Sequence, residues 1–136
     1  MGRILAIDYG ARRCGLAWTD PLKLTAQGIP TIEETILRAH LDKLIAQENI
    51  EQILLGFPTR MDGSDTHVTQ AVRDLETWLT QTHPTIPVKR WDERLTSSMA
   101  SRALIDAGVS KKKRREKGLV DQMAATMMLQ EYLTTF

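Results

Sequence analysis

The sequence predicts one α/β domain over residues 1–136, with a five-stranded mixed sheet flanked by about four helices. Three observations lead to this prediction. The length of 136 residues is that of a single domain. The composition, 42% hydrophobic and 26% charged, is typical of a chain that folds around a core. Strand-like segments come first and then alternate with segments of helical periodicity, which indicates parallel strands joined by right-handed crossovers.

The first three elements are predicted strands that pair antiparallel. Residues 3–8 (RILAID) form an apolar run that ends in a carboxylate, which indicates a buried strand. A turn containing Gly10 follows, and residues 14–19 (CGLAWT) are the hairpin partner of the first strand. We expect the third strand at residues 22–29, where Gly28 lies near its end.

Two helix–strand units come next. Thr31 is predicted to cap a helix with apolar side chains at helical spacing. Residues 51–56 (EQILLG) are apolar at their centre, as in a parallel strand covered on both faces. Ser64 or Asp65 is predicted to cap the second helix, and residues 86–91 (IPVKRW) are the fifth predicted strand.

Two more helices complete the predicted domain. One covers residues 95–107 and ends at a glycine, and the other covers Leu119–Leu133. Trp18, Trp78 and Trp91 lie on strand or helix segments next to apolar residues. We therefore expect the three tryptophans to pack in the core rather than to stack on bases.

The net charge of +1 conceals an uneven distribution. Residues 111–117 (KKKRREK) hold six basic side chains and one acid, a local charge of +5. The other 129 residues carry 12 basic and 16 acidic side chains, a net charge of −4. A short basic segment on an acidic body predicts local contact with a polyanion.

The cysteine and histidine content excludes several kinds of site. Cys14 is the single cysteine, so the chain forms no internal disulfide, and a cysteine-based zinc site is not expected. His40, His67 and His83 are widely spaced and form no paired metal motif. No signal peptide or membrane span is expected, and a reducing, cytoplasmic location fits the cysteine usage.

Three separated acids are candidates for catalysis. Asp8 ends the first strand, Asp92 and Glu93 follow the fifth, and Asp121 lies in the first turn of the last helix on a face of small apolar residues. Ligands bind at the carboxyl ends of the strands in open α/β sheets, so these acids would share one edge. Asp92 and Glu93 should point to opposite sides, and spacing alone does not decide which faces the site. Converging carboxylates suit Mg²⁺ or Mn²⁺.

Four sequence strings resemble motifs of the YqgF family, also called RuvX or the Holliday junction resolvase family. In order along the chain they are ILAIDYGARRCGLAWTD, LLGFPTRMDGSDT, WDERLTSS and VDQMAATMMLQEYL. Together they extend the resemblance over nearly the whole chain, from residue 3 to residue 133. Four motifs in the same order are a far more specific signal than any one of them.

The resemblance implies a ribonuclease H-like fold related to the RuvC resolvases. It also implies a metal-dependent nuclease that trims the 5′ end of pre-16S rRNA in ribosome biogenesis, with cleavage of branched DNA as the alternative. Matched residue by residue, the family's catalytic acids and metal ligands fall on Asp8, Glu93 and Asp121. A site for two Mg²⁺ or Mn²⁺ ions is expected there.

The chain departs from the usual family motifs at three positions. Ala11 replaces the usual threonine after IDYG, Ser97 replaces the second threonine of DERLTT, and Gln122 replaces a common lysine after Asp121. None of these changes removes an expected metal ligand. Gln122 does remove a positive charge next to the expected site.

Several residues are candidates for nucleic-acid contact. Arg12 and Arg13 lie in the first hairpin, Ser64 precedes a predicted helix start, and Arg94 follows Glu93. Solvated arginines, a simple helix cap and a structural ion pair are the respective alternatives. The basic segment is the strongest candidate and supplies Lys111, Lys112, Lys113, Arg114, Arg115 and Lys117.

Two other function classes compete with the nuclease. An actin-like ATPase or sugar kinase shares the core fold and the Asp-x-Gly turn, but such enzymes need two domains and 136 residues supply one. A non-catalytic RNA-binding factor in ribosome assembly would need only the basic segment. RNA is the favoured partner, with structured DNA and pre-ribosomal particles as alternatives, and the expected state is a monomer or a homodimer.

Overall fold

The computed structural model of the chain describes residues 2–57, 68–92, 108 and 119–135. The described strands are β1 (Arg3–Asp8), β2 (Arg13–Thr19), β3 (Ala26–Glu33), β4 (Ile50–Phe57) and β5 (Val88–Asp92). The described helices are α1 (Leu37–Gln47), α2 (Thr69–Thr82) and α5 (Leu119–Leu133), and a single 3₁₀ turn, η1 (Glu34–Ile36), precedes α1.

The five strands form one mixed sheet in the order β3-β2-β1-β4-β5. β2 pairs antiparallel with both β1 and β3, whereas β1, β4 and β5 run parallel. This arrangement confirms the predicted mixed sheet of three antiparallel strands followed by two parallel ones. β1 lies at the centre, so its carboxyl end, at Asp8, is flanked by strands on both sides.

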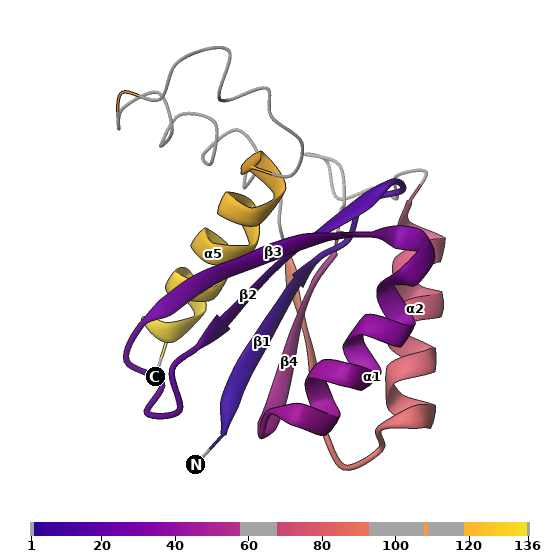
Figure 1. Ribbon diagram of the computed structural model, residues 1–136, viewed down its shortest axis with the longest axis horizontal. Helices are drawn as coiled ribbons and strands as arrows, with labels where there is room; N and C mark the ends of the chain where they lie inside the picture. Colours follow the sequence, from indigo (N-terminus) through magenta and orange to yellow (C-terminus); the bar gives the residue numbers. More distant parts are fainter. Residues whose placement is uncertain (1, 58–67, 93–107, 109–118, 136) are drawn as a thin grey trace.

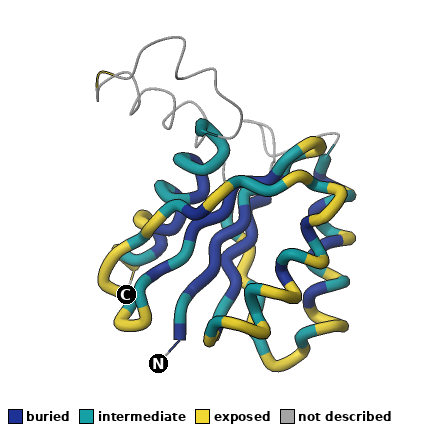
Figure 2. Tube along the Cα trace, in the orientation of Figure 1, coloured by how far each residue is buried: buried dark blue, intermediate teal, exposed yellow. Residues whose placement is uncertain are grey.

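Helices cover both faces of the sheet (Figure 1). α1 and α2 lie on one face and α5 lies on the other. The residues of the central strands are buried between these helices, while the outer surfaces of the helices are exposed (Figure 2). The predicted packing of the tryptophans is confirmed: Trp18 and Trp78 contact the core on the α1/α2 face, and Trp91 contacts the core on the α5 face.

The predicted third strand was wrong in its position. Residues 20–25 form a turn in which the Asp20 carboxylate accepts hydrogen bonds from the backbone N–H groups of Leu22, Leu24 and Thr25, and Lys23 has a φ of 59°. β3 therefore starts at Ala26. It continues through a proline because β3 is an edge strand, where a missing N–H costs no ladder hydrogen bond.

The predicted helix start at Thr31 was also wrong, because Thr31 belongs to β3 and the helical turns begin at Glu34. α2 starts at Thr69 with Val68 as its N-cap residue, and the predicted cap residues Ser64 and Asp65 lie outside the described residues. The last helix has the predicted bounds, Leu119–Leu133. The helix predicted at residues 95–107 lies outside the described residues. Among the described helices, none has the length and apolar character to cross a bilayer.

Candidate active site

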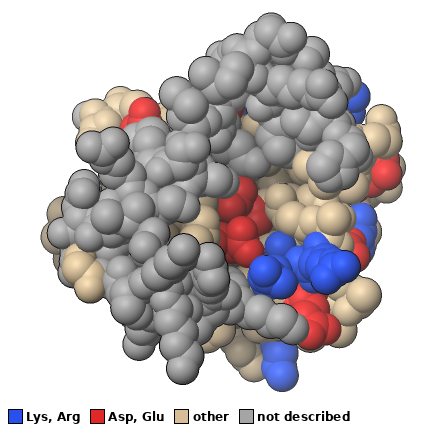
Figure 3. Space-filling model, turned by 90° about the horizontal axis from the view of Figure 1, so that it is seen from above, with Lys and Arg blue, Asp and Glu red and all other residues tan. Residues whose placement is uncertain are grey.

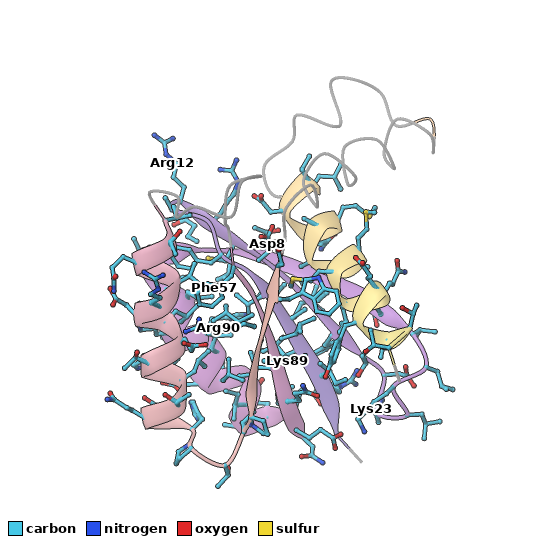
Figure 4. All side chains as sticks on the ribbon, turned by 180° about the vertical axis from the view of Figure 1, so that it is seen from behind. Asp8, Arg12, Lys23, Phe57, Lys89 and Arg90 are labelled. Carbon is cyan, nitrogen blue, oxygen red and sulfur yellow. The ribbon has the colours of Figure 1, made fainter. Side chains whose placement is uncertain are left out.

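The carboxyl ends of the parallel strands meet at one edge of the sheet. Ile7 of β1 is paired with Leu55 of β4, and Phe57 of β4 is paired with Asp92 of β5. Asp8, the last residue of β1, therefore lies at the same edge as the end of β5 (Figure 4). The sequence-based expectation that these strand ends share one edge is confirmed.

Strand alternation assigns Asp8 to the face that α5 covers. Ile4 and Ala6, two and four residues before Asp8, belong to the core cluster beneath α5, whereas Leu5 and Ile7 belong to the cluster beneath α1 and α2. Side chains two residues apart on a strand share a face, so Asp8 extends the Ile4–Ala6 row toward α5. Figure 4 shows Asp8 between the end of the sheet and the first turn of that helix.

Asp121 reaches the same place because α5 approaches β2 without a side chain between them. Gly15 of β2 is the Cα partner of Asp8 in the β1–β2 ladder. A Cβ atom at Gly15 would overlap the backbone carbonyl of Asp121. The first turn of α5 thus rests on the residue paired with Asp8, and this contact brings the two predicted acids together.

Gln122 fixes the same helical turn to the edge strand. Its side-chain amide donates a hydrogen bond of 2.8 Å to the carbonyl of Ile29, and its Cγ lies 2.8 Å from where a Cβ of Gly28 would be. The departure from the common lysine at this position therefore has a structural role. The Gln122 side chain anchors α5 to β3.

Arg13 supplies a positive charge beside the acids. Its Nε lies 3.4 Å from Oδ2 of Asp121, and the two side chains are 37% and 36% exposed. This Nε is itself buried and has no hydrogen-bond partner among the described residues. Viewed from above the carboxyl edge, acidic side chains lie directly beside a group of Lys and Arg side chains (Figure 3). The edge therefore combines negative groups that suit a cation with positive groups that suit phosphate.

The buried thiol of Cys14 lies close enough to these carboxylates for their charges to affect its pKa. Burial, together with the nearby charges of Glu34, Asp8 and Asp121, raises its pKa to about 11, and the thiol donates a hydrogen bond to the carbonyl of Gly10. Cys14 is therefore protonated at neutral pH. It packs in the core and is not a nucleophile.

The loop after Asp8 is held from the opposite face of the sheet. Tyr9 donates a hydrogen bond of 3.0 Å to the carboxylate of Glu34, and burial together with this carboxylate raises the pKa of Tyr9 to about 12. The backbone N–H of Glu34 donates to the carbonyl of Arg12 at 2.9 Å. These bonds fix residues 9–12 against η1, while the Arg12 side chain points away from the sheet (Figure 4).

The side chains of β5 alternate between the two faces of the sheet. Arg90 makes two hydrogen bonds of 2.8 Å to Glu76 of α2 and lies over the ring of Phe57, so it faces α2. Trp91 instead stacks edge-on against Tyr132 of α5. Alternation then assigns Asp92 to the α2 side, away from the side that holds Asp8.

The remaining predicted site residues lie outside the described residues. They are Glu93, Arg94, Ser64 and the basic residues Lys111, Lys112, Lys113, Arg114, Arg115 and Lys117. Within residues 2–57, 68–92, 108 and 119–135, no three His, Cys, Asp or Glu side chains form a metal-binding group. The described part of the candidate site is thus Asp8 and Asp121 with Arg13, and Arg12 lies on the loop after Asp8.

Sequence reasoning missed two positioning residues, Gly15 and Gln122. The strand and turn pattern assigns no role to Gly15, and the motif comparison indicates only the loss of a positive charge at Gln122. A glycine between Cys14 and Leu16, inside a strand, was the available signal, because glycine in a strand interior often marks close approach of another backbone. Nothing in the sequence indicated the bond from Gln122 to Ile29, since the two are 93 positions apart.

Comparison with known proteins gives relatives over the whole chain. The family model described as "RuvX: Holliday junction resolvase" matches residues 2–135. A Porphyromonas gingivalis protein named "Putative pre-16S rRNA nuclease" is 44% identical over 133 residues, which are 98% of this chain and 96% of the relative. A Flavobacterium psychrophilum protein of the same name is 42% identical and covers 98% of each chain.

Solved structures share the fold at much lower identity. The chain is similar to Thermus thermophilus RuvC in complex with a Holliday junction substrate, with a TM-score of 0.57 and 16% identity, over 99% of this chain and 96% of the other. It is also similar to fowlpox virus resolvase bound to Holliday junction DNA, with a TM-score of 0.59, 12% identity and coverage of 98% and 97%. These likenesses confirm the expected ribonuclease H-like fold.

Proposed function

Because this chain belongs to the RuvX family, we propose that it is a metal-dependent nuclease that hydrolyses phosphodiester bonds and processes the 5′ end of pre-16S rRNA. The observation that carries the proposal is the placement of Asp8 and Asp121 together at the carboxyl edge of the sheet, with Arg13 beside them. A cation held by carboxylates can activate water, and arginines can stabilise the charge of the phosphate during phosphodiester hydrolysis.

The proposed metal ligands are Asp8, Glu93 and Asp121. The carboxylate oxygens of Asp8 and Asp121 are the hard donors that Mg²⁺ and Mn²⁺ prefer, so the residues present fit such an ion. When bound, one or two of these ions supply Lewis-acid chemistry for attack of water on the phosphodiester.

The alternation of β5 supports Glu93 rather than Asp92 as the third acid. Trp91 contacts α5, and Asp92 by alternation belongs to the α2 side. Asp92 therefore does not share the side of the sheet that holds Asp8 and Asp121, and the proposal takes Glu93, the acid that the family resemblance implies.

The basic residues have two roles in the proposal. Arg13 offsets the negative charge of Asp121. Arg12 and Arg13 are both proposed to bind the phosphates of the substrate. We propose that Arg94, Ser64 and the basic residues at positions 111–117 contact the nucleic-acid strand on either side of the phosphodiester that is cut. Each phosphate contact contributes about one unit to the slope of binding against salt concentration.

Cleavage of Holliday junctions is the second candidate, because it is the activity in the description of the matching family. We rank RNA first, since relatives at 44% and 42% identity over nearly the whole chain are named for pre-16S rRNA. A non-catalytic RNA-binding role would predict RNA binding that needs neither the acids nor a metal ion. Work on a ribosomal RNA precursor is consistent with a cytoplasmic location and with pre-ribosomal particles as partners.

A cleavage assay tests the proposed function. The substrates are a pre-16S 5′ leader RNA, an unstructured single-stranded RNA and a four-way DNA junction, each with Mg²⁺, with Mn²⁺ and with a chelator. We expect metal-dependent cutting of the leader RNA by the unsubstituted protein and none by Asp8→Asn or Asp121→Asn. Asp74→Asn, at an exposed position on α2, is the matched control and should cut normally. Equal cutting by Asp8→Asn and the control would contradict the proposal.

A further inference from the structure

A cavity lies next to the acid pair on the side of the edge strand. It has a volume of about 480 Å³ and is formed by the loop after β1, the start of β2, the end of β3 and η1. Its polar lining residues are Arg12, Arg13, Thr31, Glu33 and Thr35. Ligand cavities for small molecules commonly have volumes of about 300–1,000 Å³, so this one has room for a single nucleotide.

Arg13 connects this cavity to the proposed catalytic acids. The same side chain lines the cavity and lies 3.4 Å from the carboxylate of Asp121. Arg13 is also the Cα partner of Glu33 in the β2–β3 ladder, so a positive and a negative side chain extend from neighbouring positions on the same face of the sheet. A ligand in the cavity would have one end at the acids and the other at β3.

The polar groups in the cavity have complementary hydrogen-bonding abilities. In the described part of the chain, no side chain pairs with the guanidinium of Arg12 or with the carboxylate of Glu33. Arginine donates to phosphate, whereas an ionised carboxylate only accepts and repels phosphate. The ligand group at Glu33 must therefore carry a hydrogen-bond donor.

A ribonucleotide presents this combination of groups. Its 2′-hydroxyl is a donor on the carbon next to the one whose oxygen carries the 3′-phosphate, so both groups belong to one nucleotide. Acidic side chains recognise ribose hydroxyls in other nucleotide sites. The 2′-hydroxyl is also the group by which proteins distinguish RNA from DNA.

We propose that this cavity is a ribonucleotide subsite in which Arg12 and Arg13 hold a phosphate and Glu33, assisted by Thr35, accepts the neighbouring 2′-hydroxyl. This inference rests on the proposed nuclease function and deepens it, because it makes Glu33 a specificity residue that selects RNA. Glu33 acts on the sugar and takes no part in the metal site.

Binding measurements on matched strands test the subsite. Fluorescence anisotropy is measured with 12-nucleotide single strands of one sequence as RNA, DNA and 2′-O-methyl RNA, in an Asp8→Asn background so that no strand is cut. Glu33→Ala should weaken RNA binding about tenfold, the effect of losing a hydrogen bond to a charged acceptor, and should leave binding of DNA and 2′-O-methyl RNA unchanged. Arg12→Gln should weaken all three strands alike and lower the salt slope by about one.

The controls separate this inference from the proposed function. Glu131→Ala removes the same charge from an exposed position near the end of α5 and should change no affinity. An equal change for RNA and DNA in Glu33→Ala would overturn the subsite while leaving the nuclease intact. Failure of the background protein to bind any strand, together with absent cleavage by the unsubstituted protein, would overturn the proposed function and the subsite with it.

Discussion

The two faces of the sheet are packed with side chains of different size, although the same strands supply both. The face under α1 and α2 carries large branched residues such as Leu5, Ile7 and Leu16, all fully buried. The face under α5 carries Ala6 and Ala17 at the corresponding central positions. The first face thus builds most of the core, and the second leaves little side-chain volume between strand and helix.

The difference explains how an acid on a helix reaches an acid on a strand. Gly15 and Gly28 lie on the α5 face, and each would meet α5 with an added Cβ. On the helix, Ala124 and Ala125 are buried against the sheet. Small residues on both sides permit close approach, so the first turn of α5 rests on β2. The large-residue face stabilises the fold, whereas the small-residue face positions Asp121.

The largest expected effect is on stability, from truncation on the large-residue face. Leu79 of α2 is fully buried, so Leu79→Ala should lower the free energy of unfolding by about 2–5 kcal/mol. Cleavage per folded molecule should be unchanged, because Leu79 is not on the α5 side. Chemical denaturation and a cleavage assay at low temperature measure the two quantities. A loss of cleavage greater than the loss of folded protein would contradict the assignment of stability to the α1/α2 face and of the position of Asp121 to the α5 face.

A substitution on the α5 face should lower stability less than Leu79→Ala does, and should lower the rate of cleavage more. Gly15→Ala adds a Cβ where the carbonyl of Asp121 lies, which should cost about 1–3 kcal/mol of stability. Cleavage should fall about 100-fold, because displacement of a reacting group by about 1 Å has effects of this size. Gly28→Ala is the matched control, since its Cβ meets the movable side chain of Gln122, and its loss of cleavage should be much smaller. Equal losses in the two variants would show that backbone contact at Gly15 does not position Asp121.

Removal of the positive charge beside Asp121 should have a moderate effect on cation binding. Arg13→Gln should strengthen Mn²⁺ binding several-fold in titration calorimetry without nucleic acid, because the guanidinium 3.4 Å from Oδ2 offsets part of the carboxylate charge. Stability should change by less than about 1 kcal/mol, as for other partly exposed ion pairs. Arg12→Gln is the control and should leave Mn²⁺ affinity unaltered. Weaker Mn²⁺ binding by Arg13→Gln would mean that Arg13 supports the acid pair rather than competing with the ion.

The smallest expected effect is a pH dependence of stability from the buried thiol. The pKa of Cys14 is raised from 9.0 to about 11, so between these values the unfolded chain has lost the thiol proton and the folded chain retains it. The contribution of the thiol to stability should therefore be constant below pH 9 and fall as the pH rises from 9 to 11. Urea unfolding at pH 8, 9 and 10 should show a steeper decline for the unsubstituted protein than for Cys14→Ala. Identical slopes would contradict the assignment.

Local signals in the sequence predicted most of the strands and the last helix. The apolar runs of β1 and β4 and the periodicity of α5 were sufficient because burial imposes these patterns directly. The third strand was misplaced because an Asp20-centred turn, followed by a strand that tolerates proline at a sheet edge, leaves no clear apolar period. The start of α1 was misjudged because Thr31 has a side chain suited to a cap, although strand pairing with β2 continues to Glu33.

The sequence by itself determined the fold class, the three candidate acids and the basic residues around them, because these follow from periodicity, residue type and motif order. Only the tertiary structure decided that Asp8 and Asp121 lie together and that Asp92 belongs to the opposite side. The tertiary structure also decided that the Arg13 side chain pairs with Asp121 and lines the cavity together with Glu33. These relations depend on strand register and on the approach of α5 across Gly15, which brings Asp121 to residues more than 100 positions earlier in the chain. Such contacts are set by packing of whole elements, and no local pattern encodes them.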